Sequence, residues 1–210
     1  LLNRLRAPWL YERPDLVIAT APVIQQIFAS AFGLPLDQVP ITGYPRVDIL
    51  TAQDYQPSAL DGAICREVSR LKQQGRRIVA YLPTFRDSSR TKREIPLDWA
   101  TLDAFLARQD AVLLLKLHSE DSARLPALGQ YRNILLVDHH VDVYPLLRSV
   151  DVLITDYSSV WFDYLILDRP ILFYAYDLED YLKHSRSMYF DYEEVTPGPK
   201  VRTFQDLQGE

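Results

Sequence analysis

The stretch DVLITDYSSVWFD, residues 151–163, decides the fold. Its first half, residues 152–155, is a short run of apolar and β-branched residues, the composition of a strand that is buried on both faces. Two serines, Ser158 and Ser159, come shortly after this run and open a segment with helical spacing. A strand that passes into a helix with almost no loop is typical of a βαβ unit, so this stretch predicts an α/β fold with a parallel sheet.

The same alternation continues over the rest of the chain. Apolar runs of about five residues are separated by longer stretches with helical periodicity. The predicted strands are residues 16–19, 39–42, 78–82, 111–117, 134–137, 152–155 and 171–174. The predicted helices are residues 22–32, 58–74, 98–108, 143–150, 158–167 and 177–184. We therefore expect a Rossmann-like parallel sheet over residues 51–210, and we expect residues 1–50 to be a remnant of, or a linker from, a missing N-terminal domain.

Composition excludes several classes of protein and site. The 210 residues include 23 Lys and Arg against 28 Asp and Glu, a net charge of −5, which argues against a nucleic-acid-binding protein. The single cysteine, Cys65, excludes an intrachain disulfide and a multi-thiolate zinc site. The histidines show no zinc-ligand spacing, and no glycine-rich phosphate loop occurs, so no metal or cofactor is predicted. The opening residues contain neither a signal peptide nor a spanning helix, because Arg and Pro interrupt them.

The two serines suggest an anion site at the end of the predicted strand. Open parallel sheets bind ligands at the carboxyl ends of their strands, and a helix amino terminus offers N–H groups to a phosphate. Asp163, one helical turn after Ser159, has the chemistry to accept hydrogen bonds from a ribose diol. The alternative is that Ser158 is an ordinary helix cap and Asp163 a solvated helix residue.

Two further segments place polar side chains directly after predicted strands. Lys116 and His118, in the segment KLH, suit a diphosphate or the charge that develops in phosphoryl transfer. Thr84 and Arg86, in YLPTFRD, suit the same cleft, with Arg86 as a bidentate anion donor. The alternatives are a lysine that extends to solvent and a histidine that caps a loop. We interpret the later Tyr- and Arg-rich segment, residues 169–192, as packing.

Five motifs occur in the order typical of one protein family. They are GYPRVD, YLPTFRD, KLH, DVLITDYSS with a following FD, and RPILFYAYDLEDY with later YFDY and PGP. In these motifs the chain resembles the CDP-glycerol glycerophosphotransferases, which build glycerol-phosphate polymers such as teichoic acids and related capsules. The chain departs from the family pattern where Ser119 follows KLH in place of Pro, and where Ser187 follows Arg186 in place of Gly.

The resemblance implies the C-terminal half of a GT-B-type transferase with two facing domains. That half would bind CDP-glycerol or CDP-ribitol, and the enzyme would transfer the polyol phosphate to a polyol-phosphate or glycan acceptor. His118 would be the catalytic residue at the diphosphate. The donor-binding residues would be Arg86, Ser158, Ser159 and Asp163, and the positions of Thr84 and Lys116 directly after predicted strands add these two to the predicted donor site. The general base would lie in the missing domain, and the protein would be cytoplasmic or peripheral at the inner face of the membrane.

Two other functions fit the residues. One is a GT-B glycosyltransferase that uses a nucleotide sugar, and the other is a catalytically idle nucleotide-binding domain. Preference for a UDP- or CMP-sugar over CDP-glycerol would favour the glycosyltransferase. The idle domain would be favoured if Ser158, Ser159 and Asp163 were dispensable for binding, or if no nucleotide bound at all.

Overall fold

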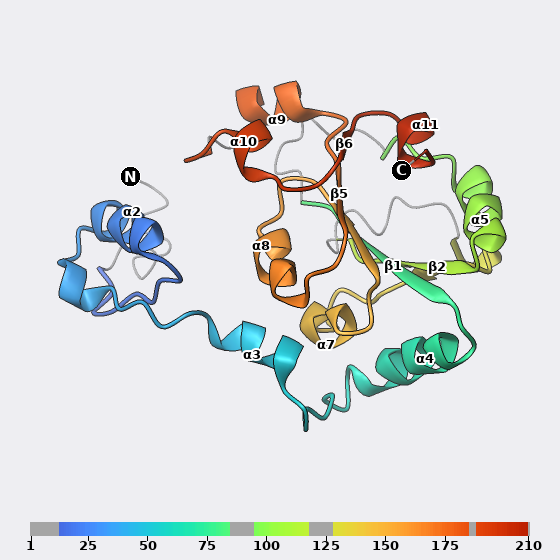
Figure 1. Ribbon diagram of the computed structural model, residues 1–210, viewed down its shortest axis with the longest axis horizontal. Helices are drawn as coiled ribbons and strands as arrows, with labels where there is room; N and C mark the ends of the chain where they lie inside the picture. Colours follow the sequence, from blue (N-terminus) through green and yellow to red (C-terminus); the bar gives the residue numbers. More distant parts are fainter. Residues whose placement is uncertain (1–12, 85–94, 118–127, 185–187, 210) are drawn as a thin grey trace, which may run out of the picture. The chain divides into compact units, whose positions relative to one another are not determined.

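The computed structural model describes residues 13–84, 95–117, 128–184 and 188–209 (Figure 1). The chain divides into two compact units, Leu1–Ala52 and Gln53–Glu210. Sequence analysis places the boundary after residue 50, two residues before this division. That the first unit is the remnant of another domain remains a prediction.

The first unit contains short helices around a small apolar core. Its helices are α2 (Pro22–Phe32), η2 (Leu36–Gln38) and α3 (Pro45–Thr51). The buried core consists of Ala19, Leu34 and Val39, against which one side of α2 packs. The predicted strands 16–19 and 39–42 are wrong as strands, because their only ladder contact is an isolated parallel bridge between Ala19 and Ile41. Helix α3 was not predicted; it starts at Pro45, where the missing proline N–H costs no hydrogen bond.

The second unit is built on a six-stranded sheet. Its strands are β1 (Arg77–Leu82), β2 (Ala111–Leu115), β3 (Ile134–Leu136), β4 (Val152–Thr155), β5 (Ile171–Tyr174) and β6 (Lys200–Val201). The strand order is β3-β2-β1-β4-β5-β6, and every neighbouring pair is parallel. Every residue of β2 and β5 is buried, which explains their continuous apolar sequences. The sheet confirms the predicted α/β fold with a Rossmann-like parallel sheet.

Helices cover both faces of this sheet (Figure 1). The helical segments of the unit are α4 (Gly62–Gln73), α5 (Trp99–Arg108), η3 (Leu128–Gln130), α7 (Val143–Leu147), α8 (Val160–Tyr164), η4 (Leu165–Leu167), α9 (Leu178–His184), α10 (Tyr192–Val195) and α11 (Phe204–Leu207). Helices α5 and α11 share one buried cluster with the alternate β2 residues Leu113 and Leu115. The intervening β2 residues, Val112 and Leu114, are buried toward the opposite face, where α4, α7 and α8 lie.

The strand β6 depends on a close backbone approach that the sequence signals only through its PGP segment. A Cβ atom at Gly198 would lie 2.0 Å from the carbonyl oxygen of Ile171, so only glycine fits between the two segments. The next residue, Pro199, accepts a hydrogen bond of 2.9 Å from the N–H of Phe173 in β5. The glycine therefore allows the C-terminal segment to join the sheet edge.

The topology selects one position on the sheet for a ligand. From β1 the chain moves outward through β2 and β3, and it then returns to β4 on the other side of β1. Open α/β sheets bind ligands at such a reversal, outside the carboxyl ends of the strands. Here those ends are Leu82 in β1 and Thr155 in β4.

Candidate functional site

A buried carboxylate joins the two loops at the strand-order reversal. Asp156 directly follows β4 and is 0% exposed. Its Oδ1 accepts hydrogen bonds from the backbone N–H of Thr84, at 2.8 Å, and of Tyr157, at 2.6 Å. One residue earlier, the Thr155 hydroxyl donates to the Leu82 carbonyl at 2.7 Å. The loop after β1 and the loop after β4 are therefore fixed to each other by the last strand residue and by Asp156.

Tyrosines from the C-terminal helices hold the loop after β4 in place. The Tyr157 hydroxyl donates to Asp177 Oδ1 at 3.0 Å, and its ring stacks on Tyr181 at a centroid distance of 4.0 Å. The Tyr192 hydroxyl donates to the backbone carbonyl of Asp156 at 3.2 Å. These contacts agree with the packing interpretation of the Tyr-rich segment.

The two serines occupy the entrance to α8. Ser159 is at the N-cap position and is exposed, but its side chain accepts no capping hydrogen bond. Ser158 is half-buried, and its Oγ lies 3.5 Å from the N–H of Val160, at the limit of a hydrogen bond. Neither serine is a strong helix cap, so the capping alternative explains these residues poorly and their hydroxyls remain suited to a ligand.

Asp163 differs from the expected exposed carboxylate. It is only 6% exposed, and its Oδ2 accepts a hydrogen bond of 2.5 Å from the hydroxyl of Tyr144 in α7. The alternative of a solvated helix residue is therefore wrong. The four-residue spacing predicts that Ser159 and Asp163 share one open face of the helix. In the structure Ser159 is exposed and Asp163 is buried, so they do not. A ribose contact at Asp163 stays a prediction. A ribose hydroxyl would either share the Asp163 carboxylate with the Tyr144 hydroxyl or displace that hydroxyl from it.

Lys116 lies one strand away from the reversal, directly after β2. Its backbone N–H donates to the Tyr81 carbonyl of β1 at 3.2 Å. Its ammonium donates to the carbonyl oxygens of Asp138 and His139, at 3.2 and 2.8 Å, in the loop after β3. Partial burial lowers the pKa of Lys116, and the nearby carboxylates of Asp138, Asp142 and Asp61 oppose that shift. Lys116 thus supports a loop in this structure, and its contact with a diphosphate stays a prediction.

The structure brings three of the predicted residues to the reversal and leaves two undescribed. Thr84, Ser158 and Ser159 lie on the two loops that Asp156 connects. Arg86 and His118 fall outside the described residues. Sequence analysis missed Asp156 as a structural centre of the site. The available signal was an acidic residue directly after a buried strand, next to the two serines.

This arrangement suits the binding of an anionic ligand at the sheet edge. Serine hydroxyls at the start of a helical segment supply donors, and the fixed loops limit the reorganisation that binding would require. Among the described residues, no helix combines the length and the apolar composition that crossing a bilayer requires.

Known proteins of one family resemble this chain over most of its length. A sequence model of the family described as CDP-Glycerol:Poly(glycerophosphate) glycerophosphotransferase matches residues 6–210. The teichoic acid ribitol-phosphate polymerase TarK of Staphylococcus aureus is 32% identical over 184 residues, which are 86% of this chain and 35% of TarK. A teichoic acid glycerol-phosphate transferase of the same species is 32% identical over 194 residues, which are 90% of this chain and 49% of that protein.

Solved structures of the wall teichoic acid polymerase TagF share the fold. One matches with a TM-score of 0.78 at 31% identity and covers 100% of this chain and 51% of that chain. A TagF variant soaked with CDPG matches with a TM-score of 0.74 at 31% identity, over 99% of this chain and 49% of that one. The chain thus spans between a third and about half of these relatives. It belongs to the CDP-glycerol:poly(glycerophosphate) glycerophosphotransferase family.

Proposed function

We propose that this chain is the donor-binding part of a glycerophosphotransferase that extends a cell-wall or capsule polymer. The observation that carries the proposal is the family match over residues 6–210, together with a polar site at the strand-order reversal inside the matched region. The full enzyme transfers glycerol phosphate from CDP-glycerol to a polymer hydroxyl and releases CMP. Because the chain spans only part of its relatives, the acceptor site and general base are assigned to a further, GT-B-type N-terminal domain.

The proposed reaction is a direct phosphoryl transfer. The acceptor hydroxyl attacks the β-phosphorus of the donor, a new P–O bond forms, and the bond to the bridging oxygen breaks. The acceptor loses its proton to the general base, and CMP departs with the bridging oxygen and its electron pair. Charge accumulates on the β-phosphate oxygens and on the leaving oxygen, so the groups that face them control the rate.

Each predicted residue receives one role in this proposal. His118 and Lys116 stabilise the diphosphate, with Arg86 as a further cation at the cleft. Ser158 and Ser159 donate to a phosphate, and Thr84 lines the cleft beside Asp156. Asp163 binds the ribose. Support for these roles comes from the matched motifs and from the placement of Thr84, Ser158 and Ser159 on adjoining loops.

The polyol of the donor requires a direct test. TarK, a ribitol-phosphate polymerase, and the glycerol-phosphate transferase are both 32% identical to this chain, so identity does not favour either polyol. We place the protein in the cytoplasm or at the inner face of the membrane, where a polymer acceptor is accessible. The chain's net charge of −5 gives it little electrostatic attraction to anionic lipid, so membrane attachment is assigned to the rest of the protein.

Calorimetric titration of this chain tests the proposal. The ligands are CDP-glycerol, CDP-ribitol, UDP-N-acetylglucosamine and CMP. Tighter binding of one CDP-polyol than of the sugar nucleotide is expected and identifies the polyol. A preference for UDP-N-acetylglucosamine supports a glycosyltransferase instead. No binding of any ligand contradicts the assignment of a donor site to this chain.

The role of His118 predicts a selective loss. His118→Ala should weaken CDP-glycerol binding and leave CMP binding nearly unchanged, because the proposed role of His118 is contact with the diphosphate and not with the nucleoside. His184→Ala is the matched control, since His184 is an exposed imidazole on α9. Equal losses for CDP-glycerol and CMP in His118→Ala exclude a role specific to the diphosphate.

A further inference from the structure

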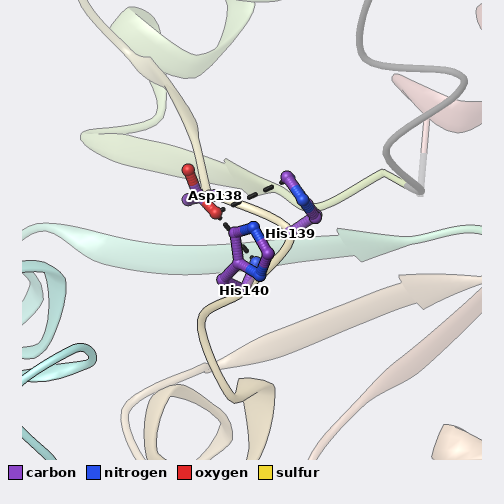
Figure 2. A group of neighbouring side chains, drawn as sticks. All are labelled: Asp138, His139 and His140. Carbon is purple, nitrogen blue, oxygen red and sulfur yellow. Dashed lines mark hydrogen bonds and ion pairs between the residues drawn. The ribbon is translucent and has the colours of Figure 1, made fainter.

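A group of three metal-ligating side chains follows β3, outside the donor site described above. Figure 2 shows Asp138, His139 and His140 with their side chains gathered on one turn. Their ligand atoms all lie within 4.8 Å of one another. His139 Nδ1 is 3.6 Å from Asp138 Oδ1, and the two imidazole centroids are 3.9 Å apart.

The backbone of this turn is fixed, although its side chains are exposed. The Lys116 ammonium donates to the carbonyl oxygens of Asp138 and His139, and the N–H of Val141 also donates to the Asp138 carbonyl, at 3.1 Å. Val141 is buried and anchors the end of the turn. A turn held in this way presents three ligands from consecutive residues without a large loss of backbone entropy on binding.

The carboxylate of Asp138 is already oriented by the turn. Its Oδ1 accepts the backbone N–H of His140 at 2.8 Å. Its Oδ2 has no hydrogen-bond partner among the residues that the structure describes, so that oxygen is available to a cation. Oriented carboxylates and imidazoles with a free nitrogen are the usual components of a metal site.

We propose that Asp138, His139 and His140 bind one first-row transition-metal dication, with Zn²⁺ as the reference ion. Two imidazole nitrogens and one carboxylate oxygen suit Zn²⁺, Ni²⁺ or Cu²⁺, whereas Mg²⁺ and Ca²⁺ prefer sites built from oxygen alone. Bonds of about 2.0–2.2 Å place tetrahedral ligands about 3.3–3.6 Å apart. Ligand atoms that now lie up to 4.8 Å apart must therefore approach by up to about 1.5 Å. The exposure of the side chains allows this movement. Water completes the coordination.

The ligands of this site lie on a different loop from the proposed donor site, and the two sites share only Lys116, whose ammonium holds the backbone of the turn. The metal site uses the turn after β3, whereas the donor site is placed between the ends of β1 and β4. Spacing rules for zinc ligands did not reveal it, because they do not include three consecutive residues whose side chains a turn gathers on one side.

The test is a competition titration of the chain with Zn²⁺ and a chromophoric chelator at neutral pH. Wild-type protein should bind one Zn²⁺ through this site. His139→Ala and His140→Ala should each weaken that binding at least about tenfold. Asp138→Asn should also weaken it while keeping the acceptor for the His140 N–H, which separates loss of a ligand from loss of the turn.

Two controls complete the design. His184→Ala removes an exposed imidazole elsewhere and should bind Zn²⁺ like the wild type. Replacing Zn²⁺ with Mg²⁺ should give no binding that depends on His139 or His140. Far-UV circular dichroism verifies that each variant is folded. The proposal is overturned if the wild type binds no Zn²⁺, if the His139 and His140 variants keep wild-type affinity, or if Mg²⁺ binds equally well.

Discussion

Asp156 connects the two loops that carry the candidate donor site, and this position gives it a measurable role. Its carboxylate accepts the N–H groups of Thr84 and Tyr157 from a fully buried position. Asp156→Asn replaces a charged acceptor with a neutral one and should lower the free energy of unfolding by about 1–3 kcal/mol. The loops should also shift, so that CDP-glycerol binds at least about tenfold more weakly. Urea unfolding and calorimetric titration measure the two effects.

A matched control lies at the other end of the same strand. Asp151 precedes β4 and accepts the N–H of Ile78 at 2.8 Å and the ammonium of Lys72 at 2.6 Å. Asp151→Asn should therefore lower stability and leave nucleotide binding unchanged. Equal weakening of binding by both variants would mean that general destabilisation, and not loop position, explains the effect of Asp156→Asn.

Asp163 provides a test of the ribose assignment. Asp163→Asn keeps an oxygen that accepts the Tyr144 hydroxyl and removes the negative charge. If the ribose diol donates to this carboxylate, CMP should bind about 1–3 kcal/mol more weakly, the scale of a lost charge-assisted hydrogen bond. Tyr144→Phe is the companion variant, because it removes the competing hydroxyl and should not weaken CMP. Wild-type affinity of Asp163→Asn for CMP removes this residue from the site.

At the scale of elements, the start of α8 is unusual in having a serine at the N-cap that does not cap. A capping serine contributes about 1 kcal/mol, but the Ser159 side chain makes no capping hydrogen bond. Ser159→Ala should therefore change the free energy of unfolding by less than about 0.5 kcal/mol while it weakens CDP-glycerol binding.

Thr203→Ala is the contrasting control, because Thr203 Oγ1 accepts the N–H of Asp206 at 3.1 Å and caps α11. It should cost about 1 kcal/mol of stability with no effect on binding. If Ser159→Ala instead lowered stability by about 1 kcal/mol and left CDP-glycerol binding unchanged, Ser159 would be a structural cap.

Elements with strong local patterns were predicted well, and those that depend on distant contacts were not. Strands β4 and β5 and helix α2 have the predicted bounds, because each combines a clear apolar pattern with distinct end signals. The two-residue β6 was missed, since it exists only by pairing with β5. The predicted strands of the first unit reduce to a single bridge, and no further strand lies beside them among residues 13–52, the part of that unit that the structure describes.

In the candidate site, too, local sequence signals predicted where residues lie, but they did not predict contacts between segments far apart in the chain. The positions of Thr84, Ser158 and Ser159 followed from strand ends and motif order. The burial of Asp163 did not, because it depends on Tyr144 from a helix that lies nineteen residues earlier in the chain. Nor did sequence alone show that Lys116 supports the turn that carries Asp138 and His139.

At the scale of the whole second unit, buried tyrosines link segments on both sides of the sheet. The Tyr164 hydroxyl in α8 donates to the Val150 carbonyl at 2.9 Å, and the Tyr174 hydroxyl in β5 donates to the Pro96 carbonyl at 2.9 Å. Burial raises the pKa of Tyr164 from 10.0 to about 12, and burial also raises the pKa of Tyr174 above its ordinary value. In the folded protein, both groups hold their protons at a pH where the unfolded chain begins to lose them.

The sign of the resulting pH dependence follows from linkage. Below pH 10 tyrosine is protonated in both states, so the contribution of Tyr164 to stability is fully present. As the pH rises from 10 toward 12, only the unfolded state ionises, and the free energy of unfolding falls. Urea unfolding followed by far-UV circular dichroism between pH 8 and 11.5 should show a plateau and then a decline.

Substitution of single tyrosines assigns that decline to its source. Tyr164→Phe removes the hydroxyl, so it should lower stability near pH 8 by about 1 kcal/mol through the lost hydrogen bond to Val150. The same variant should then lose less stability than the wild type above pH 10, because one group that ionises only on unfolding is gone. Tyr189→Phe is the control, since Tyr189 is 74% exposed and its substitution should leave the alkaline decline unchanged. If Tyr164→Phe and wild type decline in parallel, the buried hydroxyl of Tyr164 does not govern alkaline stability, and ionisation elsewhere in the chain must account for it.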